Sequence, residues 1–518
     1  MMKQETSSSE KAVEKKKAGG QSRKLEKRPE QTVMEALAEQ GVFLEDSCGG
    51  KGRCGRCRVR YLNAAPVPAA TERRFFSAEE LRAGMRLACL HKVTRECEVE
   101  PSYVQPVKLQ IVEDAFPVRK EEVQPDCSGE EKDSAQWCVA VDLGTTTIVM
   151  QARRLADGKA LSVQKMMNPQ RRFGSDVISR MQAAGGGQKE ILQKCLGDVL
   201  EAGIDRLRMD VSVQNPELDR KESGIFLAGN TVMEHLLAGL STEGLSRHPF
   251  VPVTLEEQKI RLGSEDVVLL PGFSAFVGAD LLAGVLACRM QQREEISLLI
   301  DLGTNGEIVL GNREKLLCTA TAAGPAFEGG PGNPAPGTDM IAVIAELMDA
   351  GIVDETGLMA EPWFETGVRW NPGTKSGCRD REGSADGLQN IKKGEKAPVH
   401  MTQEQIRAVQ MAKAAVYAGI CVLVKEYGIG LEDIADVYLA GGFGYYLDVS
   451  KAARIGLFPK ELTGRVKAVG NTSLAGAFLY GRNNGREEAG QVKKICRAIN
   501  LAEHCDFQTI YLEHLNLE

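Results

Sequence analysis

Apolar runs alternate with amphipathic stretches over the larger, C-terminal part of the chain. Continuous apolar runs at 137–141, 296–300 and 437–440 are typical of buried strands, whose two faces both contact other elements. Residues 402–427 carry apolar side chains at helical spacing behind a capping box formed by Thr402 and Gln405. This alternation of strands and helices predicts a domain of the α/β class over residues 136–518.

The N-terminal part contains shorter elements. Residues 1–30 are rich in Lys, Glu and Ser and nearly lack large apolar side chains, which predicts a disordered tail. Apolar spacing after Thr32 predicts a short helix, residues 58–62 alternate as a strand, and residues 97–99 predict a closing strand. Ser77 and Glu80 mark another helix start. Prolines and acidic residues at 105–135 predict a linker, so the chain divides into 1–30, 31–104, 105–135 and 136–518.

The composition argues against a nucleic-acid-binding, a membrane-spanning and a secreted protein. The 518 residues carry a net charge of −7, which gives no electrostatic reason to expect nucleic acid as a partner. No apolar run is expected to reach the length of a membrane span, and the first 17 residues lack the apolar segment of a signal peptide. Fourteen cysteines in a chain of this size, without such a signal, predict free thiols in a reducing cytoplasm.

Four of these cysteines have the spacing of a metal centre. Cys48, Cys54 and Cys57 lie on one glycine-rich loop with the spacing C-x5-C-x2-C, and Cys89 follows at a distance. Three thiolates from one loop and one from a distant segment favour a [2Fe–2S] cluster, and the plant-type spacing is one residue shorter in the first gap. A structural zinc site is the alternative, but such sites usually pair two C-x2-C knuckles and only one is present.

Two segments of the large domain repeat one pattern. Each is an apolar strand, a tight turn and a second apolar stretch, and the turns read Asp142-Leu143-Gly144-Thr145-Thr146 and Asp301-Leu302-Gly303-Thr304-Asn305. Turn amides and hydroxyls bind phosphate oxygens, and the aspartate binds Mg²⁺. A third strand runs into a glycine-rich turn with Gly441, Gly442 and Gly444, against whose bare backbone a ribose or base can lie.

The order of these three motifs resembles the acetate and sugar kinase, Hsc70 and actin superfamily. The resemblance covers residues 136–481 and implies two duplicated lobes with ATP and Mg²⁺ in the cleft between them. It implies that the two Asp-Leu-Gly-Thr turns are the phosphate loops and that residues 440–444 are the adenosine motif. Asp142 and Asp301 would then organise Mg²⁺ and the attacking water. Glu307 is either a general base or a surface residue of its hairpin.

A β-grasp [2Fe–2S] ferredoxin-like domain ahead of a two-lobed actin-like ATPase core resembles the reductive activators of corrinoid proteins. Segments 228–231, 276–280, 323–330 and 470–472 also match. The resemblance implies that ATP is used to return a corrinoid from Co(II) to Co(I), with electrons from an upstream low-potential donor. The apolar hairpin that usually opens the ferredoxin module is not evident at 15–31, where it is absent, degenerate or very polar. Residues 324–330 are either a nucleotide or partner loop or a structural turn.

Two other functions stay open on the sequence. One is a redox-regulated phosphotransferase of the sugar-kinase type, which needs a small-substrate pocket and a base in the first lobe. The other is a non-catalytic actin-like interaction protein that carries a cluster. The paired phosphate turns argue against this second alternative, because a scaffold needs no phosphate chemistry.

Overall fold

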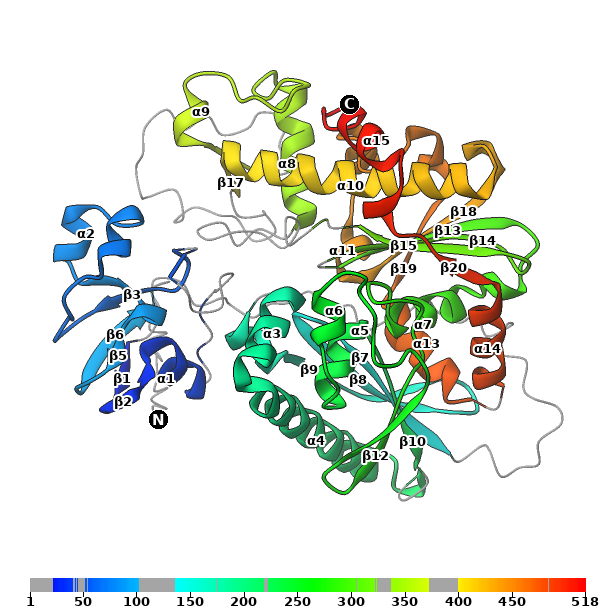
Figure 1. Cartoon of the computed structure of the whole chain (residues 1–518), viewed down its shortest axis with the longest axis horizontal. Coiled ribbons are helices and arrows are strands. Elements are labelled where there is room, and N and C mark those ends of the chain that lie inside the picture. Colours follow the sequence, from blue (N-terminus) through cyan, green and yellow to red (C-terminus); the bar gives the residue numbers. More distant parts are fainter. Residues whose placement is uncertain are drawn as a thin grey trace, which may run out of the picture. The chain divides into compact units, whose positions relative to one another are not determined.

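The chain forms two compact units, residues 1–106 and 107–518, which are described separately. The computed structural model describes residues 22–40, 42, 44, 52–53, 55–101, 136–174, 176–218, 222–303, 305–321, 323, 337–371, 399–482 and 484–518. Figure 1 shows both units coloured along the sequence. Cys48, Cys54, Thr304, residues 324–330 and the whole predicted linker, residues 105–135, lie outside the described residues.

The first unit contains a four-stranded sheet with the order β1-β6-β3-β4 and a small β2-β5 pair. The predicted helix after Thr32, the strand after Cys57, the helix after Ser77 and the closing strand are confirmed. The elements are β1 (Arg23–Leu25), β2 (Arg28–Thr32), α1 (Val33–Glu39), β3 (Arg58–Tyr61), α2 (Ala78–Arg82), β4 (Met85–Leu87), β5 (Lys92–Val93) and β6 (Cys97–Pro101).

The prediction of a disordered tail over residues 1–30 is wrong for residues 22–30. Strand β1 pairs with β6, β2 pairs with β5, and Leu25 is only 1% exposed. A short strand held by backbone hydrogen bonds needs one buried apolar anchor, so its other side chains can all be polar. The opening strands of the ferredoxin-like unit are therefore present and polar. Their sequences do not alternate between apolar and polar residues, so the pattern gave no strand signal.

The second unit has two lobes, each built on a six-stranded sheet. The orders are β11-β12-β10-β7-β8-β9 and β19-β18-β13-β14-β15-β20. In each sheet an antiparallel meander, β7-β8-β9 or β13-β14-β15, is joined by parallel strands, β10 and β12 or β18 and β19. This repeated topology confirms the predicted duplication.

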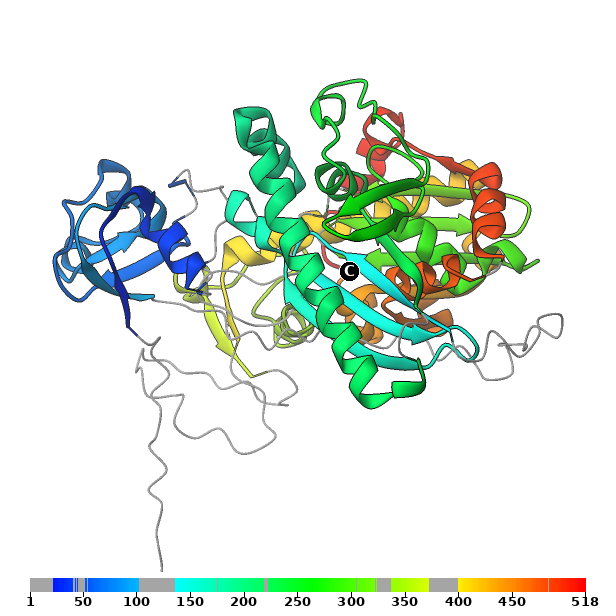
Figure 2. The same ribbon diagram turned by 90° about the horizontal axis from the view of Figure 1, so that it is seen from below.

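The first lobe contains β7 (Trp137–Leu143), β8 (Thr147–Arg154), β9 (Ala160–Met167), α3 (Val177–Ala183), α4 (Lys189–Gln214), β10 (Glu222–Gly229), α5 (Thr231–Leu237), α6 (Glu243–Ser246), β11 (Gln258–Leu262), β12 (Glu265–Leu269) and α7 (Ala279–Cys288). Helix α4 runs across the strands of this sheet (Figure 2). Its buried stripe, which includes Leu196, Leu200 and Ile204, shares one core with the strands.

The second lobe contains β13 (Ile296–Leu302), β14 (Gly306–Gly311), β15 (Leu316–Thr321), α8 (Gly337–Asp349), α9 (Trp363–Thr366), β16 (Val368–Trp370), β17 (Val399–Met401), α10 (Gln403–Tyr427), β18 (Ile434–Ala440), α11 (Gly441–Tyr446), α12 (Val449–Arg454), β19 (Val466–Gly470), α13 (Thr472–Tyr480), α14 (Gly485–Ile495), β20 (Cys496–Ala498) and α15 (Phe507–Glu513). Helices α8 and α10 pack on its sheet.

Helix α10 begins as predicted, with the Thr402 side chain accepting from the Gln405 amide. By length and composition it is apolar enough to cross a membrane, so the expectation that no segment reaches that length is wrong. Most of its apolar window, 72%, is buried inside the protein, as in the core helix of a globular domain.

Helices α7 and α13 lie between the two sheets and join the lobes (Figure 1). They cross so closely that a Cβ on Gly476 would lie 1.9 Å from the Ala283 carbonyl oxygen. The residues around this crossing form a core to which both sheets contribute. The contact therefore requires glycine at position 476, and it fixes the ends of β7 and β13 near each other.

Candidate nucleotide site and iron–sulfur ligands

The first Asp-Leu-Gly-Thr turn places Asp142 at the end of β7 against the start of α13. The Asn471 side-chain amide donates to one Asp142 oxygen at 2.8 Å, and the Ser473 hydroxyl donates to the other at 2.9 Å. Asn471 also caps α13 by accepting from the Leu474 amide. Burial raises the pKa of Asp142, and these two hydrogen bonds act in the opposite direction. The Asp142 carboxylate is thus oriented by residues more than 300 positions away in the chain.

Three carbonyl groups of this turn accept hydrogen bonds from the segment that follows β9 and from α3. The Asn168 side chain donates to the Gly144 oxygen at 2.8 Å, Arg180 donates to the Thr145 oxygen at 2.6 Å, and the Asn168 amide donates to the Thr146 oxygen at 3.0 Å. In a trans peptide the N–H points opposite to the C=O. The Thr145 and Thr146 amides, which follow the Gly144 and Thr145 carbonyls, therefore point away from the Asn168 and Arg180 donors. Turn amides of this kind can bind an anion.

The second turn places Asp301 at the end of β13, directly across from Glu307 on β14. Gly441 has φ of +81°, and a Cβ there would lie 2.7 Å from an Asp301 carboxylate oxygen. The predicted glycine-rich turn is not open: Gly441, Gly442 and Gly444 belong to helix α11, which starts directly after β18. A side chain at position 441 would press on Asp301, so glycine is required there.

Five carboxylates gather between the lobes: Asp142, Glu234, Asp280, Asp301 and Glu307. Burial, then the charges of Asp301 and Asp142, raise the pKa of Asp280 to about 7. Burial, then Asp142, raise the pKa of Asp301 to about 7. The pKa of Glu307 and that of Glu234 are also well above the usual range, because of burial and then Asp280.

This cluster fits a divalent cation. The raised pKa values of Glu234, Asp280, Asp301 and Glu307 reflect burial and a neighbouring negative charge, which a cation among the carboxylates would offset. Carboxylate oxygens are the protein ligands that Mg²⁺ prefers, and Mg²⁺ usually keeps several waters and contacts phosphate oxygens as well. The sequence left open whether Glu307 is a surface residue of its hairpin. Glu307 is only 7% exposed, so it is a buried residue.

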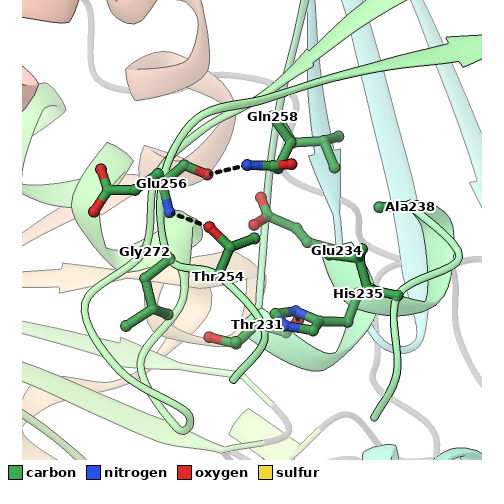
Figure 3. A pocket seen from close by; sticks show the side chains of 11 residues that line it. Thr231, Glu234, His235, Ala238, Thr254, Glu256, Gln258 and Gly272 are labelled. Carbon is green, nitrogen blue, oxygen red and sulfur yellow. Dashed lines mark hydrogen bonds between the residues drawn. The ribbon is translucent and has the colours of Figure 1, made fainter. Parts of the chain in front are cut away.

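A small pocket adjoins the cluster in the first lobe (Figure 3). Helix α5 contributes Thr231, Glu234 and His235 to its lining, the segment before β11 contributes Thr254, and β11 itself contributes Gln258. One Glu234 carboxylate oxygen is buried and accepts no hydrogen bond from the described residues. Because Glu234 also interacts with Asp280, this carboxylate links the pocket to the acidic cluster.

Cys57 and Cys89, the two described cysteines of the four predicted to bind a cluster, lie on neighbouring segments of the first unit. Cys57 is 1% exposed and Cys89 is 6% exposed, and the Ala88 amide donates to the Cys57 oxygen at 2.8 Å. Gly52 has φ of +65°, and a Cβ there would lie 2.5 Å from the Leu90 side chain. The loop thus packs against the segment that carries Cys89, as a shared cluster requires.

The sequence patterns assigned no role to several residues that the structure places at the candidate nucleotide site. Asn230, which donates to the Thr145 hydroxyl at 3.0 Å, Asp280 and Asn471 lie in segments that matched the family pattern, without an assigned role. Asn168 and Arg180 carried no motif at all. Their contacts with the first turn form because the segment after β9 and helix α3 pack against it, and this packing cannot be read from the local sequence.

Three family models match the chain. They are the RACo middle region over residues 137–293, the C-terminal ASKHA domain of RACo over 295–333 and 335–518, and the 2Fe-2S iron-sulfur cluster binding domain over 17–94. The corrinoid activation enzyme RamQ of Eubacterium limosum is 30% identical over 428 residues, which span 73% of this chain and 69% of RamQ. The chain belongs to the reductive activators of corrinoid proteins.

Two further similarities agree with this family. A reductase of the Co(II) methylated amine-specific corrinoid protein from Methanosarcina barkeri is 28% identical over 41% of this chain and 44% of its own length. The solved structure of a reductive activator for corrinoid, iron-sulfur protein has a TM-score of 0.61 and 23% identity, and covers 94% of this chain and 96% of its own. The predicted fold, a ferredoxin-like unit ahead of an actin-like core, is confirmed, and the family favours corrinoid activation over the kinase alternative.

Proposed function

We propose that this protein uses ATP to drive the reduction of a corrinoid protein from Co(II) to Co(I), with an electron from its own [2Fe–2S] unit. The relatives support the substrate class, since one is a corrinoid activation enzyme and another a reductase of a Co(II) corrinoid protein. We further propose a cytoplasmic location, a separate low-potential electron donor, and neither a nucleic acid nor a membrane as partner.

One observation carries the ATP part of the proposal. The buried acidic cluster, which includes Asp142, Asp280, Asp301 and Glu307, adjoins a turn whose Gly144 and Thr145 carbonyls accept hydrogen bonds from Asn168 and Arg180. Mg²⁺–ATP would supply a cleavable phosphate bond there, and a cluster on Cys48, Cys54, Cys57 and Cys89 would supply one electron at a time.

Each residue then has a proposed task. Asp301 and Asp142 bind and orient the hydrated cation, and Glu307 accepts a proton from the attacking water. Thr145, Thr146, Thr304 and Asn305 bind phosphate oxygens, assisted by the backbone of Gly144 and Gly303. Gly441, Gly442 and Gly444 lie along the adenosine. These assignments extend the sequence motifs to the geometry of the site.

The energy balance explains why ATP is needed. Plant-type clusters have potentials near about −400 mV, and a Co(II)/Co(I) couple is expected to be lower. A one-electron gap of about 120 mV disfavours the product about 100-fold, since each ~59 mV is a factor of ten. ATP binding and hydrolysis offset this gap if the conformations they stabilise bind the two cobalt states differently.

The test mixes the reduced, full-length protein with a Co(II) corrinoid protein and follows Co(I) by absorbance, with and without Mg²⁺–ATP. We expect Co(I) only with ATP. Cys57→Ser is expected to remove the cluster absorbance and Co(I) formation while ATP hydrolysis continues, and Cys505→Ser, at an exposed cysteine, is the matched control. ATP-independent Co(I), or full activity of Cys57→Ser, would refute the proposal.

A further inference from the structure

Arg180 on α3 is a fully buried arginine next to the first phosphate turn. Its side chain is 0% exposed, which is rare for an arginine. Its guanidinium donates to the Thr145 carbonyl at 2.6 Å and to the Gly174 carbonyl at 3.1 Å, and contacts the Met233 sulfur at 3.1 Å. One planar group therefore joins the phosphate turn, the segment after β9 and helix α5.

The surrounding chain is arranged to hold this side chain in place. Asp176 caps α3 by accepting from the Ser179 amide at 2.8 Å. Asn168, 1% exposed, donates to the same phosphate turn, and its carboxamide oxygen accepts from the amide of Gln170, which is 0% exposed. The segment from β9 to α3 thus contributes two buried polar side chains, those of Asn168 and Arg180, that donate to carbonyls of the turn.

Burying these polar side chains costs folding free energy that apolar side chains at the same positions would not cost. A guanidinium loses its hydration on burial, and a hydrophobic side chain of similar volume packs at no such cost. Its two carbonyl partners fix the fork of the guanidinium in one geometry, which a lysine ammonium cannot reproduce. Fold stability alone therefore gives a weak reason for an arginine at this position.

We propose that Arg180 is a positioning residue for the phosphate groups of the nucleotide, an inference that rests on the proposed ATP site. By holding the Thr145 carbonyl it keeps the Thr146 amide, which shares that peptide plane, turned toward the phosphates. It also places a positive charge behind a loop that receives a polyanion. Both effects act on phosphate oxygens and not on the nucleoside.

This role predicts a loss of affinity that depends on the phosphates. Calorimetric titration of the full-length protein with Mg²⁺–ATP, Mg²⁺–ADP and adenosine is the test. We expect Arg180→Met to weaken ATP and ADP binding about tenfold or more, as for loss of one charge-assisted hydrogen bond, and to change adenosine binding less than about twofold. Arg180→Lys is expected to recover only part of the loss, because it retains the charge without the fork.

Arg206→Met, at an exposed arginine of α4, is the matched control and is expected to bind like the wild type. Thermal melts check that each variant is folded. Equal losses for ATP and adenosine, wild-type ATP affinity in a folded Arg180→Met, or unfolding of both Arg180 variants would overturn the positioning role. Absence of ATP binding by the wild type and Arg206→Met would instead refute the proposed function itself.

Discussion

The two Asp-Leu-Gly-Thr hairpins share sequence and topology, but their aspartates have different surroundings. Asp142 accepts hydrogen bonds from Asn471 and Ser473 at the start of α13. The Asp301 carboxylate accepts none from the part of the chain that the structure describes, and its pKa is raised to about 7. The two lobes thus share the strand order around each hairpin, while the hairpin register differs by one residue and the contacts around each aspartate diverged.

This difference suggests a division of labour. A carboxylate held by two donors keeps one orientation, whereas a carboxylate without donors is free to turn toward a cation. Asp301 also lies against Gly441, where no side chain intervenes. We therefore expect Asp301 to contribute more to cation binding than Asp142, and Asp142 to depend on its two donors for orientation.

The largest expected effect is that of Asp301→Asn. Loss of the less constrained carboxylate is expected to lower the rate of ATP hydrolysis about 10²–10³-fold, similar to the removal of one electrostatic group from other active sites. Phosphate release is the measurement. Asp349→Asn is the control, because the Asp349 side chain is 66% exposed. A larger loss with Asp142→Asn than with Asp301→Asn would reverse the comparison.

A smaller effect is expected of Asn471→Ala. It removes one donor from Asp142, which we expect to lower the hydrolysis rate about 10- to 100-fold. It also removes the cap of α13, at a cost of about 1 kcal/mol in stability. Ser473→Ala separates the effect on hydrolysis from the effect on stability. The Ser473 hydroxyl donates to Asp142, whereas the cap of α13 is the Asn471 side chain. Unchanged hydrolysis in both variants would show that Asp142 needs no such orientation.

The smallest effect is on stability as a function of pH. The folded protein raises the pKa of Asp280 and Asp301 from 3.8 to about 7, so the folded state binds more protons than the unfolded state between these values. Metal-free protein should therefore lose stability, by several degrees in Tm, as pH rises from about 4 to 7. Mg²⁺ should restore more of it at pH 8 than at pH 6, because protons then compete less.

Thermal melts of wild type and Asp301→Asn over this range are the measurement. The variant should show a flatter pH dependence and a weaker response to Mg²⁺, because it lacks one of the titrating groups. Identical Tm–pH profiles for the wild type and the variant would mean that protonation of Asp301 does not contribute to the pH dependence of stability.

Local signals predicted the elements well. The capping boxes at Ser77 and Thr402 and the two strand-turn-strand repeats involve residues close in the chain, so their energetics are visible in the sequence. The predictions failed where long-range pairing decided the outcome. The polar segment Arg23–Leu25 forms strand β1 because β6 supplies its backbone hydrogen-bond partners. The glycine-rich segment at 441–444 forms the start of helix α11 and not an open turn.

The sequence by itself determined the chemistry available to this protein: four cysteines, two Asp-Leu-Gly-Thr turns and their order, which place it in its family. Only the tertiary structure decided which carboxylates share one space, which aspartate is held by donors, and that Asn168 and Arg180 support the first turn. The physical reason is that burial and charge depend on neighbours in space. The residues that shift the pKa of Asp301 or hold Thr145 are set by the crossing of α7 and α13 and by the return of α3, and not by adjacent positions in the chain.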